Sequence, residues 1–367
     1  MNFRALDLFS GAGGLSQGLV DAGFEIVAAV ENWEPAVLSY QANFPNHVTL
    51  RRDIGQLATE GFDELKSFGA LDLLVGGPPC QGFSIQRIGH DQDDRNDLII
   101  GFARAVAELK PRMFLMENVP GLLGHRGKKI ASEFVRQVTA AGYDVDCKIL
   151  DAASYGVPQI RRRVFFVGWI RGDRSGFAFP KARLTEGNYQ TVREAIGDLP
   201  SPPNDYSSAN QDALHRRMRL SAKNLERLRH IPPGGGFESL PVELRVNCHK
   251  AGASRIGHRS VYGRLHPDRP ANTITARFDS FTRGRFAHPW EDRNISLREG
   301  ARLQSFSDDF VFNGTQEEVA AQIGNAVPPA LARHMAEAIR KSLISEFHRT
   351  EVVQQGMLDL ESATAAA

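Results

Sequence analysis

The chain has 367 residues, with 44 Lys and Arg against 43 Asp and Glu, so its net charge at pH 7 is +1. The length suggests about two domains, and 42% hydrophobic residues with almost no net charge are untypical of a disordered chain. No apolar run approaches the roughly 20 residues of a membrane helix, and Asp7 comes too early for a signal peptide. Three cysteines, Cys80, Cys147 and Cys248, form no CxxC zinc motif and predict no disulfide framework, so we expect a reducing, cytosolic compartment.

Strand and helix patterns alternate along the first 170 residues. The apolar runs predict strands at residues 5–9, 24–30, 48–50, 71–75, 113–116, 143–150 and 164–170. Helical patterns lie at residues 15–22, 34–43, 98–109 and 132–141. Such alternation predicts an α/β fold of the doubly wound, Rossmann-like type, with a mostly parallel sheet that is covered on both faces.

The alternation is lost beyond Arg171, where Gly, Pro and Ser become frequent. It returns only in a helical pattern at residues 330–347. We expect a catalytic domain at residues 1–175, a smaller irregular domain at 176–295, and a return to the first domain with a C-terminal helix at 296–347. Residues 348–367 are expected to form a flexible tail.

A glycine-rich stretch, residues 10–14, follows the first predicted strand directly. Ligands bind at this edge of an α/β sheet, and glycines let them approach the backbone closely. Ser16 stands where a nicotinamide-binding fingerprint has its third glycine, so that cofactor is disfavoured. Glu31 ends the second strand 20 residues after Gly11, where a carboxylate commonly binds ribose hydroxyls. The pair favours an adenosine-type ligand, although each feature also occurs as an ordinary turn or strand end.

Cys80 follows the fourth strand in the sequence Gly76-Gly77-Pro78-Pro79-Cys80. A lone cysteine is commonly a small buried apolar residue, but a rigid Pro-Pro segment is better suited to positioning a nucleophilic thiol. Glu117 ends the fifth strand and would lie near Cys80 if the two strands are neighbours; its alternative is a turn-forming acid. A thiolate and an acid beside an adenosine site suggest covalent attack on an electron-poor ring.

In their order along the chain, these motifs resemble the DNA cytosine-5 methyltransferase family, of bacterial type. The motifs that carry the resemblance are residues 7–14 (DLFSGAGG), Glu31, Asp53, residues 77–84 (GPPCQGFS), residues 117–119 (ENV), residues 159–163 (QIRRR), residues 298–306 (REGARLQSF) and residues 322–329 (QIGNAVPP). The resemblance covers most of the chain. It implies a Rossmann-like S-adenosylmethionine-dependent methyltransferase domain, with the irregular domain in the role of target recognition.

The resemblance also assigns roles to individual residues. It implies catalysis by Cys80, which would attack carbon-6 of a flipped-out cytosine, with Glu117 at ring nitrogen 3, Arg163 at the exocyclic oxygen and Arg161 near the thiol or the phosphates. Glu31 would bind the ribose, and Asp53 the adenine amino group. The full set of cofactor-binding residues that it implies is Phe9, Ser10, Gly11, Ala12, Gly14, Leu15, Glu31, Asn32, Asp53, Ile54, Pro78, Asn325 and Val327. No metal is expected. Asn32 stands where the family often has an aromatic residue, so packing on adenine by Asn32 or by Trp33 remains open.

The segment from Gln211 to Trp290 carries 15 Lys and Arg against 6 Asp and Glu, which suits a nucleic-acid partner. Arginine can read guanine in the major groove, although phosphate contact is the commoner role. The candidate DNA-binding residues are Gln81, Ser84, Gln159, Arg245, Arg255, Arg259, Arg277, Arg283 and Arg285. We expect double-stranded DNA as partner, a cognate restriction endonuclease or another defence system nearby, no membrane, a monomer, and a place in the bacterial cytosol or nucleoid.

Three other functions would account for some of these motifs. An RNA (tRNA) cytosine-5 methyltransferase could use the same motifs, but the sizeable basic insert favours DNA. A nicotinamide oxidoreductase is disfavoured by Ser16 and by the Pro-Pro-Cys segment. A relic that only binds DNA would not need Cys80, Glu117 and Arg163 together.

Overall fold

The structure is a computed structural model, and it describes residues 2–79, 97–172, 177–246 and 261–345. Cys80, Gln81, Ser84, Cys248, Arg255 and Arg259 lie outside the described residues, so the predictions for them are not tested by it.

Seven strands of the described chain form one sheet in the order β3-β2-β1-β4-β5-β7-β6. The strands are β1 (Phe3–Leu8), β2 (Phe24–Glu31), β3 (Val48–Arg51), β4 (Leu73–Gly76), β5 (Met113–Asn118), β6 (Tyr143–Asp151) and β7 (Arg162–Ile170). Only β7 runs against its neighbours, β5 and β6, and the other pairings are parallel. The predicted mostly parallel sheet is therefore confirmed, and the predicted strand positions agree with the observed ones to within about two residues.

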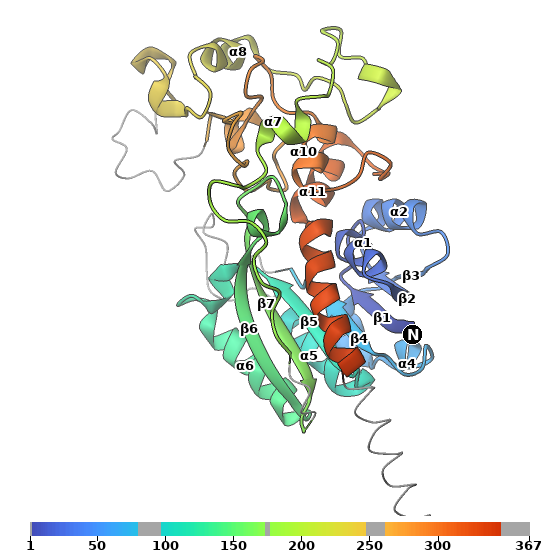
Figure 1. Ribbon diagram of the computed structural model, residues 1–367. Coiled ribbons are helices and arrows are strands. Elements are labelled where there is room, and N and C mark those ends of the chain that lie inside the picture. The colour runs from blue at the N-terminus through green and yellow to red at the C-terminus, as the bar shows by residue number, and fades with distance from the viewer. Residues whose placement is uncertain (1, 80–96, 173–176, 247–260, 346–367) are drawn as a thin grey trace, which may run out of the picture.

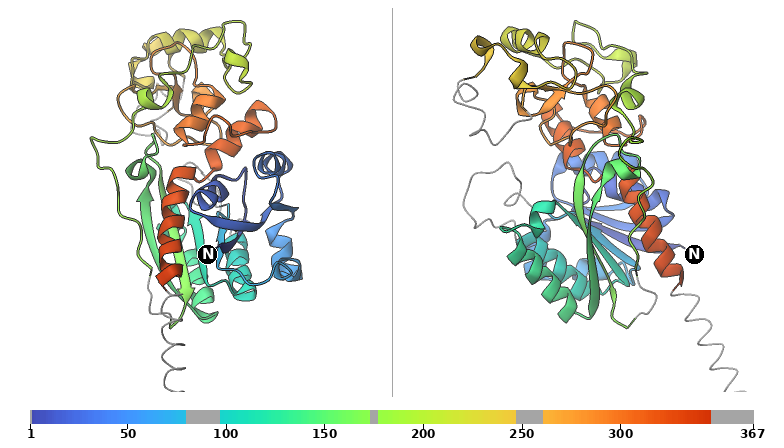
Figure 2. Two further views of the ribbon diagram at one scale, coloured as in Figure 1. Left: turned by 45° about the vertical axis from the view of Figure 1, so that its right-hand side comes forward. Right: turned by 60° about the vertical axis from the view of Figure 1, so that its left-hand side comes forward.

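Helices cover both faces of this sheet, as the right-hand view of Figure 2 shows. The helices of the sheet domain are α1 (Gly14–Asp21), α2 (Glu34–Asn43), α3 (Ile54–Glu60), α4 (Asp63–Lys66), α5 (Asp97–Leu109) and α6 (Lys128–Ala140). On one face, α3 to α6 bury their apolar side chains against Leu6, Leu8 and Phe114. On the other face, α1 and a helix at residues 329–345 pack against Ala5, Val75 and Leu115. This layering is that of a doubly wound fold.

The central strands show why the sequence adopts this arrangement. All residues of β4 and β5 are buried, as expected of strands that lie between two helical layers. Both strands end at the same edge, with Gly76 and Asn118 as their last residues. The loops after β1, β2, β4 and β5 consequently emerge together at the edge where ligands bind in such folds.

Residues 191–325 form the irregular part, most of which lies at the top of Figure 1, whereas Phe177 and Phe179 still pack against the core of the sheet domain. The short elements of the irregular part are α7 (Val192–Ile196), η4 (Ala209–Gln211), α8 (Ala222–Arg229), η5 (Phe237–Ser239), η6 (Val242–Leu244), β8 (Gly263–Arg264), η8 (Phe281–Arg283), β9 (Arg285–Ala287), α10 (Leu297–Leu303) and α11 (Gln316–Asn325). Two further short helices, η2 (Pro120–Leu123) and η3 (Ala152–Tyr155), lie in connections of the sheet domain. A hydrophobic core joins α7, α10 and α11 and extends to Tyr40 of α2 and to Phe44, which directly follows α2. This contact seats the irregular part on the sheet domain.

Candidate active site

A cavity of about 680 Å³ opens at the carboxyl edge of the sheet, where the loops after β1, β2, β4 and β5 meet. Its walls also include the segments 273–276 and 324–327, which come from the far end of the chain. Residues at the wall include Phe9, Ser10, Gly11, Ala12, Gly14, Leu15, Glu31, Asn32, Asp53, Ile54, Pro78, Asn325 and Val327. These are all thirteen residues predicted to bind the cofactor, although their binding to it stays a prediction.

The glycine loop between β1 and α1 adopts a backbone that few residues tolerate. Gly11 and Gly13 have φ angles of +55° and +102°, and Phe9 also lies in the left-handed region at +59°. A Cβ added at Gly14 would lie 2.5 Å from the carbonyl oxygen of Val327. Gly14 is thus required for the close approach of the 324–327 segment, which forms the opposite wall of the cavity.

Two acids are fixed at the ends of β2 and β3. Glu31 accepts backbone N–H bonds from Gly11 at 2.9 Å, Asn32 at 2.9 Å and Trp33 at 2.8 Å. Asp53 caps α3 by accepting from the N–H of Gly55 at 2.7 Å, and its other oxygen accepts from the amide of Asn32 at 2.9 Å. Both carboxylates are therefore held in place without a ligand.

The cavity also has the features that an adenosine-type ligand needs. The hydroxyl of Ser10 is buried and has no hydrogen-bond partner among the described residues. The backbone cradle at Gly14 and the two fixed acids line the same cavity. The residues present thus fit the cofactor that the sequence predicts.

Glu117 and Arg163 form a buried ion pair on the β5 and β7 side of the cavity. Arg163 Nε lies 2.9 Å from Glu117 Oε1, and the two side chains are 15% and 12% exposed. Burial raises the pKa of Glu117 above its usual range, and the positive charges of Arg163 and Arg161 oppose that rise. The acid therefore has two nearby cations and a tendency toward the protonated form.

The segment that leads to Cys80 lies against this acid. β4 and β5 are neighbours, as the sequence predicts, and a Cβ added at Gly77 would lie 3.3 Å from Glu117 Oε2. The amide of Asn118 donates to the carbonyl of Pro78 at 3.1 Å. The end of β5 thereby holds the Pro-Pro segment and the acid in one place.

Arg161 has a structural position that the sequence does not predict. It is 1% exposed, and its guanidinium donates to the carbonyls of Ile274, Gly324 and Ala326, each at 2.9 Å. The predicted phosphate contact does not fit this burial. Arg161 instead ties both distant wall segments to the start of β7, and its proximity to the thiol stays a prediction.

The position of Gln159 corrects one of the predicted DNA contacts. It is fully buried, and its amide donates to the carbonyl of Leu303 at 2.7 Å and to the side chain of Gln304 at 2.6 Å. Its oxygen accepts from the N–H of Ile274 at 2.9 Å. No part of this side chain can reach DNA, and the interpretation was wrong because a polar residue beside an arginine run can equally serve a buried polar network.

The described arginines of the irregular domain differ in their freedom to contact DNA. Arg245 donates to the carbonyls of Leu240 and Glu238, and Arg285 donates to the carbonyls of Gly234 and Gly235. Arg277 pairs with Asp279 and Glu317, at 3.1 and 3.2 Å. Arg283 is exposed, with no side-chain partner among the described residues. DNA contact by these four stays a prediction, and only Arg283 offers its whole guanidinium.

Trp33, which the sequence left open beside Asn32 as the residue that packs on adenine, lines the cavity, and the amide of Asn32 is bound to Asp53. Other cavity residues were not predicted from the sequence. Residues 273–276 had no local signal for this site, because only the fold brings them beside residues that lie more than a hundred positions earlier.

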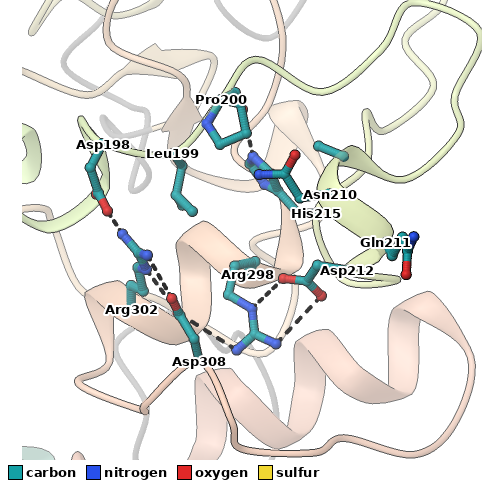
Figure 3. Close-up of a pocket in the computed structure, with 11 residues that line it drawn as sticks. Asp198, Leu199, Pro200, Asn210, Gln211, Asp212, His215, Arg298, Arg302 and Asp308 are labelled. Atoms are coloured by element: carbon teal, nitrogen blue, oxygen red, sulfur yellow. Dashed lines mark hydrogen bonds and ion pairs between the residues drawn. The ribbon is translucent and has the colours of Figure 1, made fainter.

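A second cavity, of about 470 Å³, lies within the irregular part, between α10 and the segments 198–200 and 209–215 (Figure 3). Arg298 pairs with Asp212 at 2.6 Å, and Arg302 pairs with Asp198 and with Asp308, both at 2.6 Å. These charged groups are satisfied by one another. The arrangement is that of a junction between chain segments rather than of a ligand site.

Comparison with solved structures defines the fold class. A candidate DNA modification methyltransferase encoded within an E. coli prophage superposes with a TM-score of 0.67 at 28% identity, covering 93% of this chain and 99% of that one. Dnmt2 from Spodoptera frugiperda shares the fold with a TM-score of 0.64 at 16% identity, over 92% of this chain and 99% of that one. The protein has the Rossmann-like methyltransferase fold.

Sequence comparison then identifies the family. The model of the C-5 cytosine-specific DNA methylases matches residues 3–341. The type II methyltransferase M1.HphI of Haemophilus parahaemolyticus is 38% identical over 352 residues, which cover 94% of this chain and 89% of that protein. The type II methylase M.HgiDII of Herpetosiphon aurantiacus is 34% identical over 353 residues, covering 95% and 98%. The chain belongs to the C-5 cytosine-specific DNA methylase family, which confirms the predicted enzyme class, a DNA cytosine-5 methyltransferase. Among the described residues, no helix is long and apolar enough to cross a membrane.

Proposed function

We propose that this protein methylates carbon-5 of cytosine within a specific sequence of double-stranded DNA, with S-adenosylmethionine as the methyl donor and Cys80 as a covalent nucleophile. The observation that carries the proposal is the buried Glu117–Arg163 pair, which lies beside the Gly77–Pro78 segment and in one cavity with the glycine loop of β1. An acid, a cation and the segment that leads to a thiol thus line the same cavity as an adenosine-type site.

The residues that would hold the cofactor are those of the β1, β2 and β3 ends. Glu31 would accept from the ribose hydroxyls and Asp53 from the adenine amino group, since both carboxylates are already fixed at the cavity wall. Trp33 is our choice for packing on adenine, because the amide of Asn32 is bound to Asp53. When bound, S-adenosylmethionine supplies a methyl group on a positively charged sulfur.

The chain's own residues would prepare the cytosine. The base must leave the helical stack, at a cost of a few kcal/mol, because its carbon-6 is inaccessible within the duplex. The Cys80 thiolate adds to carbon-6 while Glu117, whose pKa is raised by burial, holds and protonates ring nitrogen 3. Carbon-5 thereby becomes nucleophilic. After methylation, a solvent base takes the carbon-5 proton, the bond between carbon-6 and the thiolate breaks, and nitrogen 3 returns its proton to Glu117 as the ring is restored.

Arg163 would have two tasks in this scheme. Its Nε holds Glu117 Oε1, which orients the carboxyl group. Its positive charge also favours the thiolate form of a nearby cysteine and can stabilise charge on the exocyclic oxygen of cytosine. Arg161 would act as a positioning residue, because its guanidinium binds wall carbonyls.

Duplex DNA is the substrate we favour over RNA, because the irregular domain is basic and because the two curated relatives named above are described as type II enzymes. Those names also support a cognate restriction endonuclease as a functional partner. Bisulfite sequencing of DNA exposed to the protein would give the activity and the target sequence together. Methyl transfer to tRNA with none to duplex DNA would refute the proposal.

A second experiment tests the nucleophile. A duplex with 5-fluorocytosine at the target should trap the protein covalently, because the fluorine cannot leave as the proton does. Cys80→Ser should abolish trapping and turnover while cofactor binding is retained. Cys147→Ser is the matched control: Cys147 is an exposed thiol on β6 whose pKa is raised by partial burial and by Asp146. Trapping by the Cys80→Ser protein would refute the assignment.

A further inference from the structure

Four basic side chains gather in the connection that follows Glu117. We define the β5–α6 basic turn as His125, Arg126, Lys128 and Lys129, all of which are exposed. No acidic residue occurs in the sequence between Glu117 and Glu133. None of the four side chains has an ion-pair partner among the described residues. The turn is therefore a concentration of positive charge that no acidic side chain of the described residues pairs with.

The turn has a defined backbone that fixes these charges relative to the active site. The N–H of Gly124 donates to the carbonyl of Gly121 at 3.0 Å, and the N–H of Lys128 donates to the carbonyl of Gly124 at 2.8 Å. Gly127 is needed for this path, because a Cβ there would lie 2.4 Å from the carbonyl oxygen of Leu122. Leu122 is fully buried, and η2 also packs against β7. The cations are thus held close to the β5 end that carries Glu117.

The irregular domain, by contrast, uses much of its positive charge internally. Arg264 is 5% exposed and donates to the carbonyls of Ile231, Leu228, His288 and Glu291 and to Asp292. Arg245, Arg277 and Arg285 are also engaged within the protein. Its basic composition therefore overstates the charge that its described part can offer to phosphates.

We propose that the β5–α6 basic turn is a second DNA-contacting surface, which binds backbone phosphates of duplex DNA on the catalytic-domain side of the cavity. The inference deepens the proposed function and rests on it. The turn and the cavity lie at the same edge of the sheet, where α6 begins in Figure 1. A target base held at Glu117 brings its neighbouring phosphates to that edge, and exposed, unpaired cations are what such phosphates bind.

Salt dependence tests the proposal, because each phosphate neutralised contributes about 0.9 to the slope of log affinity against log salt concentration. Lys128→Gln/Lys129→Gln should lower the magnitude of the slope by up to about 1.8. The loss of affinity would then be about 60-fold greater at 0.1 M than at 1 M salt. The loss should be equal for a duplex with the target sequence and for one without it, since phosphates carry no sequence information.

A matched control removes two other lysines. Lys110→Gln/Lys341→Gln has the same net charge as the Lys128→Gln/Lys129→Gln protein, and both of its replaced lysines are exposed. Lys110 precedes β5 and so lies at the opposite edge of the sheet. The control should keep the wild-type slope. Equal slopes for the wild type and the Lys128→Gln/Lys129→Gln protein would overturn the inference, provided that the wild type methylates duplex DNA. A wild type that neither binds nor methylates duplex DNA would instead refute the proposed function.

Discussion

The buried carboxyl group of Asp7, which lies just before the glycine loop, allows a quantitative prediction of how stability depends on pH. Asp7 lies in β1 and is fully buried. Its Oδ2 accepts from the hydroxyl of Ser16 at 2.6 Å, the hydroxyl of Tyr40 donates to Ser16 at 2.9 Å, and Tyr40 lies 3.1 Å from His47 Nδ1. Its Oδ1 has no partner among the described residues. Burial raises the pKa of Asp7 from 3.8 to about 7, the Ser16 bond opposes the rise, and the charge of Glu31 adds to it.

This rise makes the stability of the protein depend on pH. Because the folded pKa exceeds the unfolded one, the folded state favours the neutral acid, and the associated stability is fully present below about pH 4 and lost as the pH rises through 7. At 1.36 kcal/mol for each pKa unit, the raised pKa of Asp7 lowers the free energy of unfolding by about 4 kcal/mol at pH 8 and above, relative to its value at low pH. Asp7→Asn keeps the shape and an acceptor for Ser16 but has no charge to ionise.

The assay is urea unfolding of both proteins between pH 5 and pH 8. At pH 5, Asp7→Asn should already be more stable than the wild type by about 1.6 kcal/mol, and at pH 8 by about 4 kcal/mol, so the difference should grow by roughly 2.5 kcal/mol across the range. Asp21→Asn, at an exposed position of α1, should leave the pH profile unchanged. Parallel profiles for the wild type and Asp7→Asn would refute the reasoning, because they would show that the buried carboxyl does not titrate in this range.

Two further predictions concern the arginines at the start of β7. Arg161→Met should lower the free energy of unfolding by about 3–5 kcal/mol, because the carbonyls of Ile274, Gly324 and Ala326 lose buried charged donors. Arg162→Met, at an exposed position, is the control. Equal stability of the two variants would contradict the structural role of Arg161. Arg163→Gln removes a cation that opposes the raised pKa of Glu117. The pKa should rise further, so the alkaline limb of the kcat profile should move to higher pH while kcat falls; an unmoved limb, measured on duplex DNA, would show that Glu117 is not the titrating acid.

The sequence by itself determined the parts of the protein that depend on local patterns and on neighbouring strands. Alternating apolar runs specify the doubly wound sheet, because strands buried on both faces need continuous apolar segments. Consecutive strands tend to pair, which is why the adjacency of Glu117 and the segment before Cys80 could be predicted. The glycine loop could be recognised because only glycine readily adopts the backbone at Gly11 and Gly13.

The tertiary structure decided what each polar side chain binds. Composition counts charges but does not indicate which carbonyls or carboxylates lie within hydrogen-bond reach of a guanidinium. That reach depends on contacts between residues more than a hundred positions apart, such as Arg161 with Ile274 and Gln159 with Leu303. For this reason Gln159 was misassigned and the roles of Arg245 and Arg285 within their own domain were not foreseen. The positive charge left free at the β5–α6 basic turn became visible only when the internal partners of the other arginines were known.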